Sequence, residues 1–289
     1  MAGSPDEEAV SGAHEVCRVA AAAAALSVAV AGAAAADSPC RGSGAVEQAT
    51  VRAVTDALTL QLADGRSVRL AGIEVPAAPS VPAPDSALGK DTAVRARDFL
   101  AGELTGKPIH LYLVGSTADR HGRLRAYIFV DRAADAKGLE RSIQQAMVIH
   151  GLARVSARVG DPVCAAALRA DEDGARRAGA GVWGLPDHAV RRAGDPEALR
   201  RLRGRFVLVE GRLLSVRESG ATMYLNFGRR WSEDFTATIA RRNLRHFEAG
   251  GVNPRRLERR TVRVRGWIEE RGGPWIELLR PEQIEVVGN

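Results

Sequence analysis

The fold of the first half of this 289-residue chain depends on one stretch, Val68-Arg69-Leu70-Ala71-Gly72-Ile73-Glu74-Val75-Pro76-Ala77. In the residues before it, 49–62, valine and leucine alternate with polar residues, as in one half-buried strand. The pair Asp64-Gly65 follows, which is typical of a hairpin turn, and residues 67–73 resume the alternation. We therefore expect a β-meander that ends in this stretch.

Further strands and helices are expected after the meander. Residues 77–84 are rich in proline and predict a loop. The later apolar patterns predict two strands, over 108–114 and 124–130, and three helices, over 90–104, 139–150 and 163–178. This order predicts a five-stranded antiparallel barrel of the OB type with added helices, in a fold that is mainly β with α.

A second set of strands begins at residue 206. Strands are expected over 207–217, 222–227, 235–239, 261–269 and 275–279, with a short helix over 241–247. This pattern predicts a second OB-like β-barrel domain. The expected organisation is an arm over 37–48, an OB-type domain over 49–184, a basic linker over 185–205 and the second β domain over 206–289.

The N-terminal residues 1–36 have the features of a signal peptide. Residues 19–36 read VAAAAAALSVAVAGAAAA, an apolar run that follows Arg18 and closes on small residues before Asp37. The run is rich in alanine and has no basic residues directly after it, which argues against a membrane span. We expect a periplasmic or secreted protein whose mature chain has no transmembrane segment. The first residues are acidic, so translation is expected to start further in, near Val16.

The cysteines are consistent with export. Cleavage after Ala36 removes Cys17 and leaves Cys40 and Cys164 in the mature chain. Two cysteines in an oxidising compartment suggest one disulfide. The alternative is that both are small, buried, unpaired residues.

The charge of the chain permits a polyanionic partner without requiring one. Lys and Arg number 41 against 35 Asp and Glu, a formal net charge of +6, and most of the basic residues are arginine. The guanidinium group forms paired hydrogen bonds with phosphate or carboxylate.

Four motifs carry a resemblance to a known family. They are Val54-Thr55-Asp56-Ala57-Leu58-Thr59-Leu60, the stretch from Val68 to Ala77, Asp119-Arg120-His121-Gly122-Arg123, and His150-Gly151-Leu152-Ala153-Arg154-Val155, followed by Gly181-Val182-Trp183. In this order they resemble the thermonuclease (staphylococcal-nuclease-like) family over residues 49–184. The resemblance implies an OB-type barrel and calcium-assisted hydrolysis of phosphodiesters, with nucleic acid as the partner.

The phosphate-binding side of the family's site is present in this sequence. Arg69 and Arg123 match the family's two catalytic arginines, which stabilise charge on the phosphoryl oxygens. Arg120 stands where the family often has a lysine near the nucleotide, and is a third candidate phosphate contact. The alternative is structural, with Arg69 or Arg123 paired to an acid such as Glu74 or Asp119.

The metal-binding side departs from the family. Leu58 stands where the family has a ligand aspartate, and leucine cannot bind calcium. Glu74 aligns with the other ligand aspartate, and Val75 replaces the adjacent threonine. Asp56 and Glu74 are therefore the only candidate ligands left, and Ca²⁺ is expected only if the site is still active.

The family's general base is also missing. Ala77 stands where the family has its catalytic glutamate, and the next acid is Asp85, whose spacing does not argue for a catalytic role. Loss of a general base costs about 10²–10⁴ in rate. The family's nucleotide-packing tyrosines align with Ala157 and Val159, which weakens base stacking.

The C-terminal half contains most of the aromatic residues. They are eight of the 13 in the chain: Phe206, Tyr224, Phe227, Trp231, Phe235, Phe247, Trp267 and Trp275. Aromatic residues between arginines on OB-type strands are one way to hold single-stranded nucleic acid. The alternative, that they form the core, is expected for Tyr224, Phe227, Phe235 and Trp267. Trp231 and Trp275 follow turn residues and are expected to be exposed.

Three functions remain open from the sequence. The first is a catalytically impaired nuclease homologue that binds nucleic acid or another phosphate-bearing polyanion through Arg69, Arg120 and Arg123. The second is an active metal-dependent endonuclease with an altered metal site, using Glu74 and Asp56. The third is a structural or interaction module of the cell envelope that has kept the barrel and lost the ligand. Whether the chain is an enzyme stays open, because Leu58, Val75 and Ala77 replace family residues.

Overall fold

The computed structural model describes residues 38–41, 46–76, 92–130 and 140–288. The expected signal peptide over 1–36, the proline-rich loop over 77–84, and the positions of Ala77 and Asp85 lie outside the described residues. No helix within the described ranges has the length and apolar character needed to cross a membrane.

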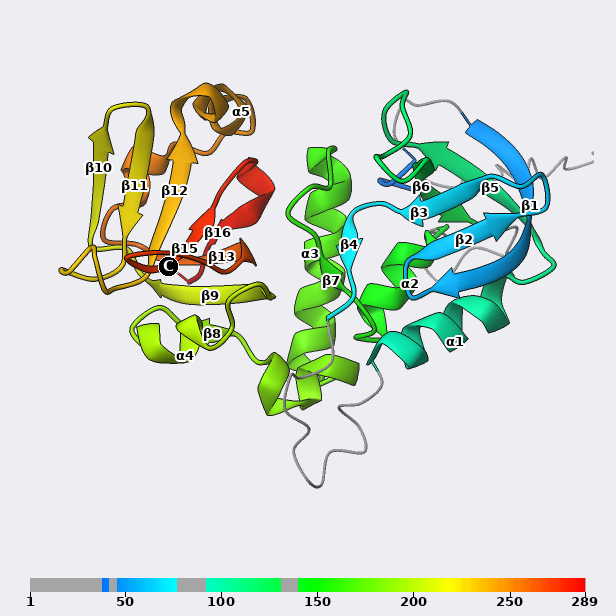
Figure 1. Ribbon diagram of the computed structural model, residues 1–289, viewed down its shortest axis with the longest axis horizontal. Helices are drawn as coiled ribbons and strands as arrows, with labels where there is room; N and C mark the ends of the chain where they lie inside the picture. The colour runs from blue at the N-terminus through cyan, green and yellow to red at the C-terminus, as the bar shows by residue number, and fades with distance from the viewer. Residues whose placement is uncertain (1–37, 42–45, 77–91, 131–139, 289) are drawn as a thin grey trace, which may run out of the picture. The chain divides into compact units, whose positions relative to one another are not determined.

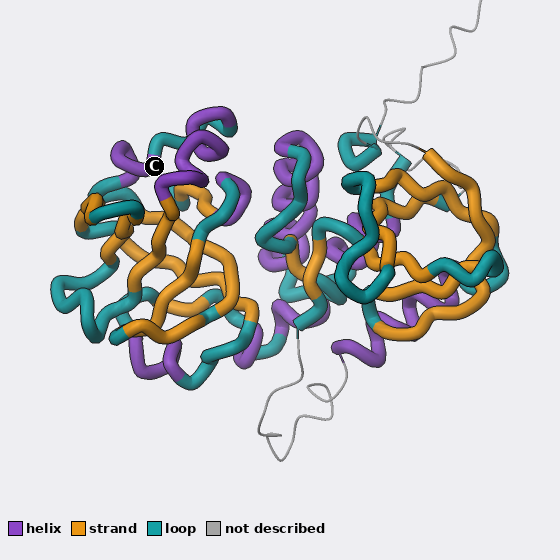
Figure 2. The backbone as a smooth tube through the Cα atoms, turned by 45° about the horizontal axis from the view of Figure 1, so that its top comes forward, coloured by secondary structure: helices purple, strands orange, loops and turns teal. Residues whose placement is uncertain are grey.

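Five strands of the first half form a closed barrel (Figures 1 and 2). In barrel order they are β1 (Val46–Asp56), β2 (Thr59–Leu62), β3 (Ser67–Leu70), β6 (Arg123–Phe129) and β5 (Pro108–Leu113). β3 and β6 pair in parallel, and the other four pairs are antiparallel. The predicted five-stranded OB-type barrel is confirmed, but the expectation that all its strand pairs are antiparallel was wrong for β3 and β6.

Two aspartates shape the turns of the meander. Asp64 Oδ1 accepts a hydrogen bond of 2.9 Å from the Arg66 amide, beside Gly65 at φ +90° in the β2–β3 hairpin. Asp56 Oδ1 accepts one of 2.8 Å from the Leu58 amide, which closes the turn between β1 and β2. The single strand expected over 49–62 is therefore two strands.

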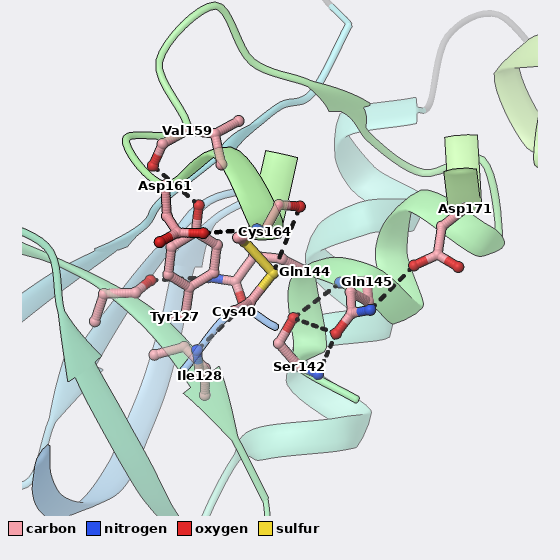
Figure 3. Close-up of a disulfide and its surroundings, with 11 residues drawn as sticks. Cys40, Tyr127, Ile128, Ser142, Gln144, Gln145, Val159, Asp161, Cys164 and Asp171 are labelled. Atoms are coloured by element: carbon pink, nitrogen blue, oxygen red, sulfur yellow. Dashed lines mark hydrogen bonds between the residues drawn. A yellow bond between two sulfur atoms is a disulfide. The ribbon is translucent and has the colours of Figure 1, made fainter. Parts of the chain in front are cut away.

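Three helices accompany the barrel: α1 (Thr92–Leu104), α2 (Ile143–Ile149) and α3 (Pro162–Arg177). Ser142 and Gln145 form a capping box at the start of α2, and Asp161 caps α3 ahead of Pro162. The buried Gln144 bridges α2 and β6, accepting from the Ile128 amide at 3.1 Å and donating to the Ala126 carbonyl at 2.8 Å (Figure 3).

A disulfide joins Cys40 to Cys164, as expected (Figure 3). The two residues are 124 positions apart in the chain, and both are buried. Cys164 lies in the first turn of α3, so the bond ties the segment before the barrel to the helix that follows it.

Two of the sequence motifs meet through their glycines. A Cβ at Gly151 would lie 2.0 Å from the Ala180 carbonyl oxygen, and a Cβ at Gly181 would lie 2.4 Å from the Gly151 oxygen. The Val182 amide donates to that same Gly151 oxygen at 3.0 Å. These glycines are therefore required by close backbone packing.

The segment expected to be a basic linker contains regular structure. It holds two short elements, β8 (Arg191–Arg192) and α4 (Pro196–Arg200), and a 3-10 turn over Pro186–His188. β8 pairs in parallel with β9 (Phe206–Arg212), so this segment extends a sheet of the C-terminal half.

The C-terminal strands form two sheets, and a second closed OB-like barrel is not confirmed. One sheet has the order β10 (Ser215–Ser219), β11 (Thr222–Asn226), β12 (Thr236–Ala240), β15 (Gly273–Glu277), β14 (Glu269–Arg271). The other has the order β16 (Ile284–Val286), β13 (Thr261–Trp267), β9, β8. A helix, α5 (Leu244–Ala249), follows β12.

Four aromatic residues were assigned to the core of this half, and two of them lie there. Phe227 and Phe235 are buried, whereas Tyr224 and Trp267 are exposed. Tyr224 lies between Met223 and Leu225, which face the core, so its side chain lies on the opposite face of β11.

Of the two tryptophans expected to be exposed, only Trp231 is, at 75%. Trp275 is buried at 6% exposure because it lies within β15, with the Arg271 guanidinium 4.1 Å from its ring centre. The expectation for Trp275 was therefore wrong.

A buried ion pair connects α3 to β13. Arg265 Nη1 lies 2.8 Å from Glu172 Oε2, and the two side chains are 2% and 0% exposed. Glu172 Oε1 accepts from the Val155 amide at 2.7 Å, and Arg265 donates to the Val155 carbonyl at 3.2 Å. The two charges thus compensate each other, and both side chains also bond to the backbone of the short strand β7 (Arg154–Val155). This strand pairs with β4 (Ile73–Glu74).

Candidate functional site

A cavity of about 380 Å³ opens where β3 leads into β4. Its wall includes Arg69 of β3, Glu74 of β4 and Arg125 of β6, with Arg158 from the segment after β7. Trp267, Glu269 and Glu277 from the C-terminal sheets also line it. Residues 69–74, from the motif that opens the sequence analysis, therefore form one side of this cavity.

Arg69 and Glu74 form an ion pair in the cavity wall. Arg69 Nη2 lies 3.5 Å from Glu74 Oε2, and the side chains are 29% and 25% exposed. Burial raises the pKa of Glu74, and the nearby charge of Arg69 partly offsets that increase. The pair matches the structural alternative considered from the sequence, but both groups remain accessible from the cavity.

Arg123 has a closer partner than Arg69 has. Its Nη2 and Nε lie 2.7 Å and 2.9 Å from Asp119 Oδ2, a two-point contact within the β5–β6 turn. The Asp119 carboxylate also accepts from the Arg123 and His121 amides, and these bonds with Arg123 hold the pKa of Asp119 well below its usual range. Arg123 is not among the residues that line the cavity.

Arg120 lies in the same turn and is exposed. Its Nε lies 3.1 Å from His121 Nε2. Of the three arginines predicted to bind phosphate, the structure thus places Arg69 in the cavity wall and Arg120 and Arg123 together on the β5–β6 turn.

The cavity contains two arginines that sequence reasoning did not single out. Arg125 lies opposite Arg69 in the parallel β3–β6 register, and Arg158 follows β7. Both are exposed, and neither has a carboxylate within ion-pair distance among the described residues. The alternation of Arg123 and Arg125 along one strand was a signal for Arg125, whereas the pairing across β3 and β6 could not be derived from the sequence.

The residues at the metal-ligand positions do not fit a calcium ion. Leu58 is 6% exposed and packs in the hydrophobic core of the barrel. The Asp56 carboxylate is engaged with the backbone of its own turn. Within the described ranges, no group of three or more His, Cys, Asp or Glu residues could hold a metal ion.

A comparison with protein-family models matches one segment of the chain. The model described as Staphylococcal nuclease homologue matches residues 67–184, from the start of β3 to the end of the 3-10 turn after α3. The resemblance inferred from the motifs is confirmed for this segment, which contains Arg69, Glu74, Arg123 and Cys164. A search of curated proteins found no match.

Proposed function

We propose that this chain is a catalytically impaired nuclease homologue that binds nucleic acid or another phosphate-bearing polyanion. The observation that carries the proposal is the cavity around Arg69. It retains an accessible arginine cluster, Arg69, Arg125 and Arg158, while Leu58 fills the metal-ligand position with a buried aliphatic side chain.

The arginine cluster supports binding of phosphate. Arg69 has one partially exposed carboxylate at 3.5 Å, so a phosphate group can compete for it at small cost. Arg125 and Arg158 add donors on the same wall, and arginine binds phosphate through two parallel hydrogen bonds. Arg120 and Arg123, near the β5–β6 turn, are further candidate phosphate contacts outside the cavity lining.

The metal positions argue against efficient hydrolysis. A hard divalent cation needs several oxygen ligands, and the pair of Asp56 and Glu74 is too small a set, with Asp56 already bonded to the Leu58 amide. Without the ion, the charge that develops on the phosphoryl group loses several kcal/mol of stabilisation.

An active endonuclease is the second candidate, and Glu74 favours it. Its carboxyl lies in the same cavity as three arginines, and burial raises the pKa of Glu74 above its usual value. This candidate requires that metal ligands be supplied by the substrate or by water.

One experiment separates the two candidates. Labelled single- and double-stranded DNA and RNA are incubated with the chain from Asp37 onward, in calcium, in manganese and in chelator, and both cleavage and binding are followed. We expect salt-sensitive binding without cleavage, with Arg69→Ala lowering the slope of log affinity against log salt by about one.

The matched control is Arg66→Ala. Arg66 is an exposed arginine on the β2–β3 hairpin, paired with Asp64 and Glu47 and outside the cavity. Metal-dependent cleavage that is lost in Arg69→Ala or Arg123→Ala would establish the endonuclease instead. Arg69→Ala and Arg123→Ala variants that lose stability but no binding would favour the structural module of the cell envelope.

We also propose that the protein is exported to the periplasm or secreted. The Cys40–Cys164 disulfide supports this location, because such bonds persist in oxidising compartments. Cell fractionation tests it, together with mass spectrometry of the mature N-terminus, for which we expect Asp37. Retention of the full-length chain in the cytoplasm would contradict the proposal.

We further propose that the two C-terminal sheets are one OB-type barrel. The order β10-β11-β12-β15-β14 repeats the order β1-β2-β3-β6-β5, and in both the third and fourth strands pair in parallel. Only two residues separate β9 from β10, and only one residue separates β13 from β14. In addition, β9 pairs with β13. If β9 and β10 are one bent strand, and β13 and β14 are another, the two sheets close into one barrel. An experimental structure would test this.

A further inference from the structure

The C-terminal half contains a second cavity, on the face of its five-stranded sheet that is turned away from its core. It has a volume of about 270 Å³ and is lined by residues of β11, β12, β14 and β15 and of the β11–β12 loop. We call it the sheet groove. Glu277 alone lines both this groove and the cavity around Arg69.

Strand alternation explains the character of the groove. Thr222, Tyr224 and Asn226 of β11 line it, whereas the intervening Met223 and Leu225 are buried in the core. On β12, Thr236 and Thr238 line it in the same way. The groove thus presents hydroxyl and amide groups beside an aromatic ring.

Three aromatic side chains line the groove. Tyr224 is 37% exposed and Trp231 is 75% exposed, so both present ring surface to solvent. Trp275 is buried, and its Nε1 has no hydrogen-bond partner among the described residues. The groove thus groups aromatic surface beside polar side chains, and apolar surface that is grouped and rimmed by polar residues is typical of a binding site.

The loop that carries Trp231 is held in place by its neighbours. The Arg230 amide donates to Asp234 Oδ2 at 2.8 Å, and the Asp234 amide donates to the Arg230 carbonyl at 2.8 Å. The β14–β15 turn packs so closely on this loop that a Cβ at Gly273 would lie 2.5 Å from the Asp234 carbonyl oxygen. Trp231 is therefore exposed on a braced loop.

Three arginines lie in the groove or next to it. Arg271 is part of the lining, and Arg217 and Arg229 neighbour lining residues. Arg217 lies opposite Tyr224 in the β10–β11 register, Arg229 lies two residues before Trp231, and Arg271 stacks on Trp275. Within the described ranges, no carboxylate forms an ion pair with these three arginines. Glu277 is the one carboxylate in the groove lining.

We propose that the sheet groove binds single-stranded nucleic acid, with bases stacked on Tyr224 and Trp231 and phosphates held by Arg217, Arg229 and Arg271. Rings with unpaired arginines around them match a chain of planar bases joined by phosphates. A neutral saccharide would also suit the rings and hydroxyls, but it would leave the three arginines without a function. The inference does not rest on the function proposed for the Arg69 cavity.

The test is equilibrium binding, measured by fluorescence anisotropy, with two labelled 12-nucleotide probes. One is oligothymidine, and the other is an abasic strand with the same number of phosphates. We expect the abasic strand to bind at least tenfold more weakly, because stacking needs the bases. Tyr224→Ala and Trp231→Ala should each weaken oligothymidine binding about 5- to 100-fold, and Trp231→Phe should restore most of it.

Two controls keep the result specific. Thermal melting shows whether each variant is folded, and Arg256→Ala removes an exposed arginine that does not line the groove. Arg69→Ala should retain the difference between the two probes, even where it lowers the affinity for both.

Three results would overturn the inference: no binding of oligothymidine, equal binding of both probes, or full oligothymidine binding by Tyr224→Ala and Trp231→Ala. Binding of a neutral oligosaccharide in place of oligothymidine would assign the groove to sugars. If Arg69→Ala has no effect on any probe while the groove variants do, the function proposed for the Arg69 cavity fails and this inference stands.

Discussion

Two arginine–glutamate pairs in this molecule use the same side chains in opposite environments. Arg265 and Glu172 lie between α3 and β13, 2.8 Å apart and closed off from water. Arg69 and Glu74 lie in a cavity wall, 3.5 Å apart and each about one quarter exposed. The first pair is surrounded by backbone groups of β7, whereas the second faces open space.

This difference teaches which arginines are available to a ligand. Removing one partner of a buried pair leaves an uncompensated charge in a medium of low dielectric constant, so such an arginine is fixed by the fold. A partially exposed pair contributes little to stability and can exchange its partner for a phosphate. The comparison therefore indicates a structural role for Arg265, whereas Arg69 is accessible to a ligand, as the proposed function requires.

The largest effect is expected for Glu172→Gln. This change keeps the size of the side chain but removes the closest counter-charge of the buried Arg265, which then keeps Glu285 at 3.4 Å. We expect a loss of about 3–4 kcal/mol in the free energy of unfolding, the lower part of the range for a broken buried pair. Urea denaturation followed by circular dichroism measures it. Glu74→Gln is the matched control in the exposed pair, and an equal loss in the two variants would break the comparison.

A slightly smaller effect is expected from removing the disulfide that anchors α3, the helix that carries Glu172. Replacing Cys40 and Cys164 by serine should cost about 2–4 kcal/mol, because the unfolded chain regains the freedom of a long closed loop. Thermal unfolding of the double variant tests this. Reduction of the wild-type protein with dithiothreitol should lower its unfolding temperature by the same amount. If dithiothreitol also lowers the unfolding temperature of the double variant, the effect has a cause other than this disulfide.

The buried histidine His188 should make the stability of the protein depend on pH. Burial and the nearby Arg154 guanidinium lower the pKa of His188 to about 4, from 6.5. The neutral form is favoured in the folded state, so its contribution is complete above pH 6.5 and is lost as the pH falls toward 4.

The expected loss from this histidine is about 2 kcal/mol between pH 7 and pH 4.5. The measurement compares the wild type with His188→Gln by urea denaturation at both pH values, so that carboxylates common to both proteins cancel. The same pH dependence in both proteins would show that His188 does not contribute.

The smallest stability effect is expected for Arg69→Ala. Because the Arg69–Glu74 pair is partially exposed, its loss should change the free energy of unfolding by less than about 1 kcal/mol. The same variant should weaken binding of a phosphate-bearing oligonucleotide, as measured by anisotropy. A variant that loses stability and keeps its affinity would show that Arg69 is a structural residue.

The barrel could be predicted from the sequence because its signals are local. Alternating apolar residues predicted the strands around Leu60 and Val68, and Asp64-Gly65 marked the hairpin between them. The strands that were not predicted, β7, β8, β14 and β16, are two or three residues long. Such strands exist because a distant strand supplies their hydrogen bonds, and no local pattern reports that partner.

The candidate site shows the same limit. Arg69, Arg123 and Glu74 could be named because each belongs to a recognisable motif, and both ion pairs considered from the sequence, Arg69 with Glu74 and Arg123 with Asp119, are present. Arg125 was not singled out because its relation to Arg69 depends on the register of two strands far apart in the chain.

The C-terminal aromatic residues were the hardest to place. Hydrophobic character assigned Tyr224 and Trp267 to the core, but the pleat of each strand turned them toward solvent. Turn residues before Trp275 suggested exposure, whereas the strand β15 begins within that turn. The face of a strand that meets the core is decided by packing, which composition alone does not reveal.

The disulfide has a mechanical consequence. Cys40 and Cys164 enclose every strand of the first barrel, together with α1 and α2, in one covalent loop. A force applied to the two ends of the chain bypasses that loop. The two cysteines are 124 positions apart, which corresponds to about 410–450 Å of fully extended chain. Pulled in a single-molecule experiment, the oxidised protein would extend only through its N-terminal segment and its C-terminal half, and the hidden length would appear only after reduction.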